Sequence, residues 1–154
     1  MNIVLDQKKN FLQTIENAVG TYMFRNLWAN VDGVDKDILE DGDLSCAQFV
    51  SGVLYLNGLI KERHATVEGT VRDIEGFGWK KIKEPKIGSI LVWEAMEYPD
   101  GSKHGHIGFY VGDQKAISNS PKEKSPQYHR WTYARENESD YRRVSSIYWN
   151  TLLD

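Results

Sequence analysis

The chain has 154 residues, of which 40% are hydrophobic and 27% charged, as expected for one globular domain that spans residues 1–154. Its formal net charge of −3 argues against general nucleic-acid binding, which needs a basic surface. The single cysteine excludes an intramolecular disulfide, and no run approaches the ~18 apolar residues of a membrane span. The first residues lack the basic-then-apolar order of a secretory signal, so we expect a soluble, monomeric protein made in the cytoplasm.

The first predicted element is a helix from about Asp6 to Trp28, either continuous or broken near Gly20. Its apolar residues fall on one stripe: Phe11, Leu12, Ile15, Val19, Tyr22 and Met23. The opposite face carries charges of both signs, so we expect the stripe to pack on the protein's own core.

An acidic, glycine-bearing segment, residues 30–43, comes next. Its alternating Asp and Gly residues suggest calcium binding. However, the spacing does not follow the EF-hand template, and no glutamate closes the loop at the right offset. We therefore interpret the segment as a surface loop that leads into the next helix.

The only cysteine, Cys46, lies where an amphipathic helix is expected to begin. Ser45 and Gln48 have the spacing of a capping box, and Asn57-Gly58 is typical of a helix end. A thiol in the first helical turn lies near the positive end of the helix dipole, which favours the nucleophilic thiolate. The alternative for a lone cysteine is a small, buried apolar residue. Cys46 is therefore a candidate nucleophile that still needs a base.

The rest of the chain contains one more predicted helix, followed by strands. Thr66 is expected to cap a helix that ends near Gly78. Strands are predicted at residues 89–94, 106–111, 115–119, 128–133 and 143–149. The short connection at residues 112–114 predicts an antiparallel hairpin. This order indicates an α+β domain in which N-terminal helices pack on a C-terminal antiparallel β-sheet.

Two histidines, His104 and His106, have the spacing that points both side chains to the same face of an extended segment. An imidazole has a pKa near neutrality and can take the proton of a thiol. The same spacing also suits a two-histidine metal site, with His129 or Asp100 as further ligands, but no paired cysteine or second cluster completes the set. We expect neither a metal nor another cofactor, and interpret the histidines as candidate bases for Cys46.

Three segments in sequence order carry a family resemblance: residues 45–50 (SCAQFV), 85–93 (PKIGSILVW) and 106–112 (HIGFYVG). Together they resemble the bacterial cell-wall cysteine peptidases and amidases of the NlpC and CHAP type, over residues 43–120. The resemblance implies a compact papain-like fold with Cys46 as nucleophile and His106 as base. It also implies a third polar residue on the following strand. Asn119 is the expected orienting residue because its amide oxygen can accept the imidazole N–H, whereas Ser118 would point to the opposite face.

The function implied by the resemblance is hydrolysis of an amide bond through an acyl-enzyme on Cys46. The implied substrate is a peptidoglycan stem peptide or an N-acetylmuramoyl-L-alanine amide. The protein would act on it either in the cell wall, after release of the protein from the cell, or inside the cell. The residues expected to contact the substrate are Ser45, Trp93, Glu94, His104 and Ser118, with segment 128–131 as a further candidate.

Two alternatives remain open at this point. An enzyme with the same fold would transfer the acyl group to an acceptor other than water, which makes it an acyltransferase. A non-catalytic binding module is the other alternative, because the Asp-Cys-Ser triplet usual in the NlpC group is Ser45-Cys46-Ala47 here.

Overall fold

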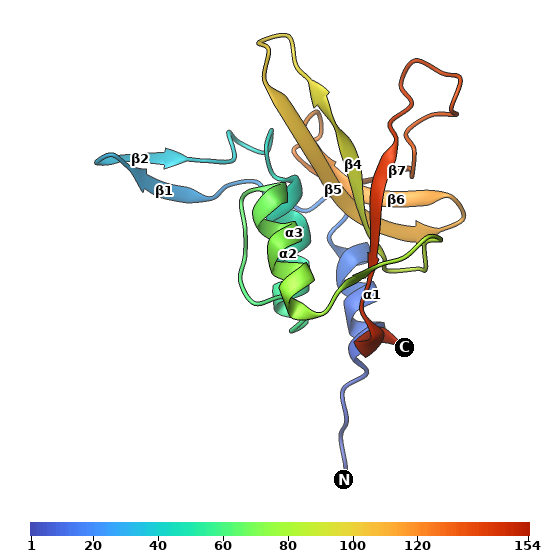
Figure 1. The fold of residues 1–154 in the computed structure, drawn as a ribbon. Helices are drawn as coiled ribbons and strands as arrows, with labels where there is room; N and C mark the ends of the chain where they lie inside the picture. Colours follow the sequence, from blue (N-terminus) through green and yellow to red (C-terminus); the bar gives the residue numbers. More distant parts are fainter.

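Three helices from the first half of the chain pack against a six-stranded antiparallel sheet in the computed structural model, which describes residues 1–154 (Figure 1). The helices are α1 (Gln7–Asn17), α2 (Cys46–Leu56) and α3 (Val67–Phe77). The strands, in spatial order, are β3 (Lys80–Lys81), β8 (Val144–Trp149), β4 (Ile90–Glu97), β5 (Lys103–Gly112), β6 (Lys115–Ser120) and β7 (Ser125–Arg130). The chain ends in a 3-10 turn, Thr151–Leu153. The predicted α+β class is confirmed.

The main core fixes α2 against β5. Phe11 of α1, Phe49 of α2 and Phe109 of β5 are fully buried. Phe109 meets Phe11 and Phe49 edge-on, with ring centroids 5.6 and 5.5 Å apart. Burial of each such side chain contributes about 1.5–3 kcal/mol. The same contacts hold the first turn of α2 beside the strand that carries His106.

Helix α2 begins at Cys46 and ends before Asn57 and Gly58, as predicted, and Gly58 has the left-handed φ of 65°. The predicted capping box is wrong. Ser45 has φ −89° and ψ 2° rather than an extended backbone, and its hydroxyl donates to the carbonyl oxygen of Arg25 at 3.2 Å. The side-chain oxygen of Gln48 is buried without a hydrogen-bond partner.

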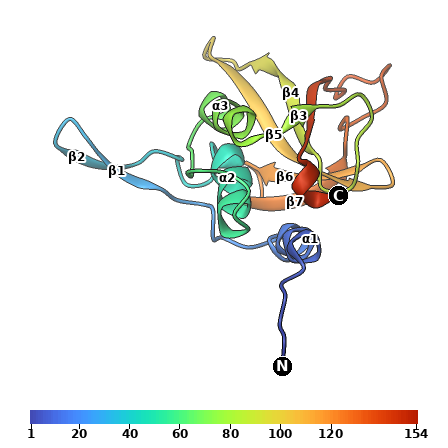
Figure 2. The ribbon, with the colours of Figure 1, turned by 60° about the horizontal axis from the view of Figure 1, so that its bottom comes forward.

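The predicted loop at residues 30–43 is partly wrong, because a hairpin precedes the turns that lead to α2. Strand β1 (Trp28–Val31) pairs with β2 (Val34–Asp37). The hairpin projects from the body of the molecule as an arm, at the left of Figures 1 and 2. Its turn residues, Asp32 and Gly33, have φ values of 52° and 85°, which suit a two-residue hairpin turn.

The predicted break near Gly20 is confirmed, but the chain after it, up to residue 27, is not helical as predicted; α3 ends where expected. Helix α1 ends at Asn17, and the chain turns at Gly20, whose φ is 77°. In α3 the Thr66 side chain accepts from the Gly69 amide, and Gly78 closes the helix with a φ of 111°. None of the helices has the length and apolar character needed to cross a membrane.

The predicted hairpin after residue 111 is confirmed. Strands β5 and β6 pair antiparallel, with Gly108 opposite Ser118. Asp113 and Gln114, in the connection, have positive φ values of 49° and 59°. Strand β7 covers residues 125–130 rather than 128–133, so Tyr133 lies in a turn beyond the sheet. The pairing of β5 with β6 decides which β6 side chains meet His106.

Candidate active site

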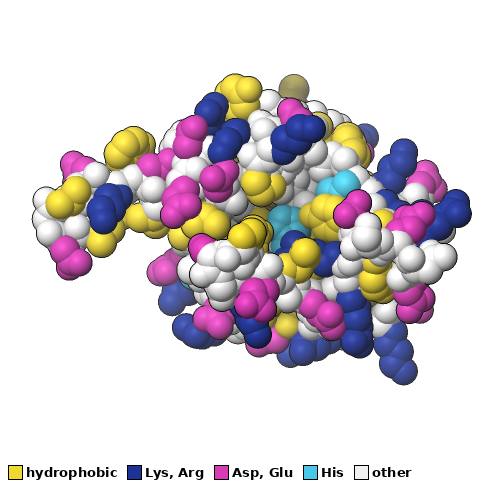
Figure 3. All heavy atoms as spheres, turned by 90° about the horizontal axis from the view of Figure 1, so that it is seen from above, with side chains coloured by type: hydrophobic (Ala, Val, Ile, Leu, Met, Phe, Trp, Pro, Cys, Tyr) yellow, Lys and Arg dark blue, Asp and Glu magenta, His cyan; other side chains and the backbone are white.

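Cys46 and His106 come together in one cavity of about 940 Å³. Cys46 opens α2, and His106 lies on β5 opposite Trp93 of β4. The backbone N–H groups of Ile107, next to His106, and of Ala47 act to favour the thiolate form of the sulfur. The thiol therefore lies against the strand that carries the imidazole. Seen from above, histidine side chains lie in a hollow near the middle of the molecule (Figure 3).

Burial dominates the electrostatics of the pair. It raises the pKa of the Cys46 thiol, although backbone N–H groups and the charge of Arg142 act in the opposite direction. Burial also lowers the pKa of His106 to about 3, and the charge of Arg142 contributes to that shift. The resting site therefore holds a neutral thiol and a neutral imidazole. The helix-start amides favour the thiolate, as expected from the sequence, but burial outweighs them.

Ser118 of β6 is the polar residue that contacts the imidazole. Its hydroxyl oxygen lies 2.9 Å from Nε2 of His106 and 2.6 Å from Nε2 of His129. The hydroxyl of Tyr133 lies 3.1 Å from the same oxygen. Ser118 is 1% exposed, so water does not compete for these hydrogen bonds. One serine hydroxyl thus joins His106, His129 and Tyr133.

Asn119 does not make the imidazole contact expected of it. Its amide donates to the carbonyl oxygen of Gly42 at 2.9 Å and so holds the segment that precedes α2. Successive side chains on a strand point to opposite faces, and the register of β5 with β6 turns Ser118, not Asn119, toward His106. Asn119 still lines the Cys46 cavity. The orienting contact therefore belongs to Ser118.

The hydrogen bonds around Ser118 determine which nitrogen of each histidine carries a proton. Nδ1 of His129 lies 2.7 Å from the carbonyl oxygen of Arg130, which only accepts, so Nδ1 of His129 is protonated. Burial lowers the pKa of His129, so its ring is neutral and its Nε2 accepts the single Ser118 proton. Ser118 then has only lone pairs for His106, whose Nε2 must donate. Neutral His106 consequently keeps Nδ1 unprotonated, as a base requires.

Aromatic rings enclose the two histidines. The Trp93 ring centroid lies 5.0 Å from that of His106 and 5.6 Å from that of His129. Tyr133 stacks on His129 with centroids 4.1 Å apart and ring planes 12° apart. Trp93 is itself anchored, because its indole N–H donates to the carbonyl oxygen of Trp131 at 2.8 Å. These contacts restrict the rotation of both imidazoles.

Gly108 allows β6 to approach the site closely. A Cβ atom at this position would lie 2.7 Å from the Cβ of Ser118, 2.7 Å from the Ile117 carbonyl oxygen and 3.1 Å from the Trp93 ring. Any side chain at residue 108 would therefore displace Ser118 or Trp93. The glycine of the His-Ile-Gly-Phe segment has a direct role in positioning Ser118 beside His106.

The expected substrate-contacting residues divide into two groups. Trp93, Glu94 and His104 line the Cys46 cavity. Ser118 lines an adjoining cavity of about 560 Å³ together with His106. Ser45, also expected to contact the substrate, is fully buried and lines neither cavity.

The alternative metal site is not assembled. His104 and His106 make hydrogen bonds to different serines, Ser102 and Ser118. No group of three or more His, Cys, Asp or Glu side chains is arranged to hold a metal ion. His129, considered in the sequence as a ligand or cleft residue, instead contacts Ser118.

Two residues of the site, Tyr133 and Arg142, were not singled out from the sequence. Tyr133 lies in the turn after β7, and Arg142 lies just before β8. The Arg142 guanidinium donates to the carbonyl oxygens of Glu94 and His104, at 3.1 Å each. Both residues come from irregular segments, in which no periodic pattern indicates where a side chain points.

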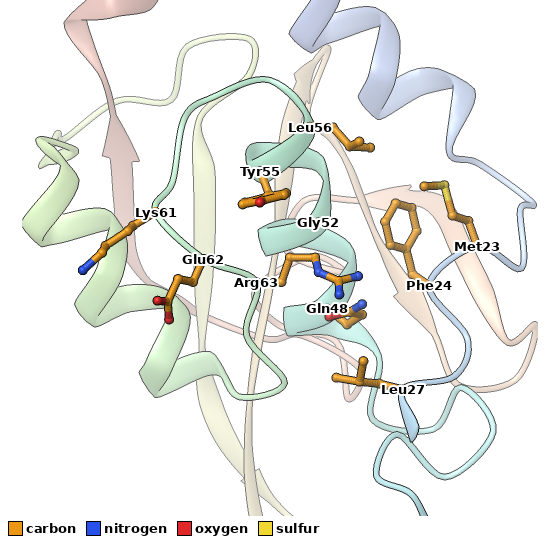
Figure 4. A pocket seen from close by; sticks show the side chains of 10 residues that line it. All are labelled: Met23, Phe24, Leu27, Gln48, Gly52, Tyr55, Leu56, Lys61, Glu62 and Arg63. Carbon is orange, nitrogen blue, oxygen red and sulfur yellow. The ribbon is translucent and has the colours of Figure 1, made fainter. Parts of the chain in front are cut away.

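A separate cavity of about 720 Å³ lies along another face of α2 (Figure 4). Gln48, Gly52 and Tyr55 of α2 and Phe24 border it, and no cysteine or histidine lines it. It offers no nucleophile or base. The reactive groups are therefore confined to the cavities that His106 borders.

Comparison of the chain with models of known protein families finds no match, and no curated protein matches its sequence. The case for a function therefore depends on the chemistry of Cys46, His106 and Ser118 and on the resemblance of three short segments.

Proposed function

We propose that this protein is a cysteine hydrolase that cleaves an amide bond, with Cys46 as nucleophile, His106 as base and Ser118 as the orienting residue. One observation carries the proposal. A helix-start cysteine shares a cavity with a buried histidine whose hydrogen bond to Ser118 leaves Nδ1 free to accept a proton. A nucleophile, a base and a group that holds the base are the parts that thiol catalysis requires.

The reaction begins with a neutral pair. Nδ1 of His106 takes the thiol proton as the Cys46 sulfur attacks the carbonyl carbon of the substrate. The tetrahedral intermediate then collapses: the C–N bond breaks, and His106 returns the proton to the departing amine. Water, deprotonated by His106, attacks the resulting thioester, which releases the carboxylic acid and restores the thiol. Backbone N–H groups at the start of α2 stabilise the oxyanion in both steps.

The substrate class we propose is a peptidoglycan fragment, either a stem peptide or an N-acetylmuramoyl-L-alanine amide. The resemblance of residues 43–120 to cell-wall peptidases and amidases supports it. The size of the Cys46 cavity, about 940 Å³, and its mixed lining of aromatic, acidic and basic side chains also suit a short peptide.

A non-catalytic binding module is the second candidate, and one observation favours it. Burial raises the pKa of Cys46 and lowers that of His106, so the resting site lacks the ion pair of an activated thiolate. In such a module, Cys46 would serve only as a partly buried apolar residue.

Alkylation of Cys46 by iodoacetamide across pH 5–9 separates the two candidates. With His106 as base, proton transfer accompanies attack, so we expect only a shallow pH dependence in the native protein. His106→Ala should restore the roughly tenfold rise per pH unit of an unassisted thiol below its pKa. His104→Ala is the matched control, because His104 lines the same cavity two residues away. A steep, unassisted profile in all three proteins would refute the hydrolase proposal.

A further inference from the structure

Arg142 is a fixed cation without an anionic partner. Its Nε and one terminal nitrogen donate to backbone carbonyl oxygens of Glu94 and His104, at 3.1 Å each. The ion pairs of the structure do not include Arg142. By contrast, its neighbour Arg143 pairs with the Glu94 carboxylate at 3.3 Å. No carboxylate of the protein therefore forms a direct ion pair with Arg142.

This charge lies beside the reacting groups. Arg142 and His106 line the same cavity of about 560 Å³, which adjoins the Cys46 cavity through shared residues including His106 and Asn119. The charge of Arg142 acts to favour the Cys46 thiolate, although burial still raises the pKa of Cys46. It also acts on His106, whose pKa it lowers further after burial.

A cation in this position opposes the base. It makes His106 a weaker proton acceptor, and arginine stays charged at every relevant pH. An anion bound in the cleft would neutralise the charge of Arg142 and so restore the ability of His106 to accept a proton. A guanidinium has five N–H donors, and the two carbonyl contacts use two of them, which leaves donors available for a carboxylate. Asp140 borders the same cavity but makes no ion pair with Arg142.

We propose that Arg142 binds a free carboxylate of the substrate, on the leaving-group side of the scissile amide. We place it on that side because Cys46, which keeps the acyl group, does not line the cavity of Arg142, whereas His106, which protonates the leaving amine, borders both cavities. The protein would then prefer peptides whose leaving residue ends in a carboxylate over the corresponding amides. This inference deepens the proposed function and depends on it for the identity of the leaving group.

The test compares the acid and the amide of one small peptide. The binding of N-acetyl-L-alanyl-D-alanine and of its C-terminal amide is measured by NMR titration of the full-length, ¹⁵N-labelled protein. A charge-assisted hydrogen bond contributes about 1.5–3 kcal/mol, so we expect the acid to bind roughly 10–100-fold more tightly than the amide. Arg142→Gln should remove this preference, and Arg142→Lys should reduce it because lysine lacks the bidentate fork.

Arg143→Gln is the matched control, since it removes the same charge one residue away and should leave the preference unchanged. Equal affinities for acid and amide in the native protein, a preference that survives Arg142→Gln, or no binding of either peptide at millimolar concentration would overturn the proposal. The titration needs no turnover. The hydrolase proposal is tested separately: it fails if the pH profile of Cys46 alkylation is the same in the native protein and in His106→Ala.

Discussion

Replacing Ser118 with alanine removes the one hydroxyl that joins His106, His129 and Tyr133. Ser118 is 1% exposed, so the Nε2–H of His106 and the Nε2 of His129 lose a partner that lies inside the protein. Each unsatisfied buried group costs about 1–3 kcal/mol, and rotation of the Tyr133 hydroxyl toward one of them recovers part of that cost. We expect unfolding free energy to fall by about 2–4 kcal/mol, or roughly 5–15 °C in Tm.

The same variant should also disturb the base. Without the serine oxygen as acceptor, no contact keeps the proton of His106 on Nε2, so ¹⁵N NMR should show a mixture of tautomers where the native protein shows one. Assisted alkylation of Cys46 by iodoacetamide should slow accordingly. Asn119→Ala is the control: it is similarly buried and loses its hydrogen bond to Gly42, so it should destabilise the fold without changing the tautomer. The reasoning is refuted if Ser118→Ala keeps the single tautomer, or if Asn119→Ala loses it.

Three further predictions concern pH and packing. His106 has a pKa of about 3 in the folded protein against an ordinary 6.5, so below pH 6.5 the unfolded chain takes up a proton that the native protein excludes. The free energy of unfolding should therefore fall as the pH drops from 6.5 toward 3. Urea unfolding at a series of pH values should show a weaker decrease over this range in His106→Gln. Gly108→Ala should lower the free energy of unfolding by about 1–3 kcal/mol, because the added methyl group would overpack against Ser118. An unchanged Tm and an unchanged rate of Cys46 alkylation would contradict the close approach of β6. Burial opposes ionisation of Asp37, but hydrogen bonds from backbone amides and Asn26 lower the pKa of Asp37 to about 2. The Leu27 amide donates to this carboxylate, so Asp37→Asn should speed hydrogen exchange at the Leu27 amide. Unchanged exchange would mean that the carboxylate does not hold the base of the arm.

The features predicted correctly from the sequence are those set by local chemistry. The start of α2 at Cys46, the left-handed stop at Gly58 and the β5–β6 hairpin each depend on residues close together in the chain. The arm was not predicted because its strands are short and exposed, although Asp32-Gly33 is a typical hairpin turn. A strand without a buried face gives no alternating pattern to detect.

The orienting residue could not be settled from the sequence for a different reason. Ser118 and Asn119 are adjacent, and only the pairing of Gly108 with Ser118 decides which of them faces His106. His129 and Tyr133 depend further on how the chain turns after β7. These are relations between distant segments, so neither composition nor local spacing encodes them.

The chain of hydrogen bonds through Ser118 has a fixed direction, and this bears on the reorganisation energy of the proposed reaction. Nε2 of His106 donates to Ser118, and Ser118 donates to His129. When His106 gains a second proton at Nδ1, its Nε2 remains a donor, so no hydroxyl has to rotate and no other proton has to move. The hydrogen bonds of the imidazole are thus the same in its neutral and its charged form. Such preorganised dipoles lower a barrier without a cost at the moment of reaction.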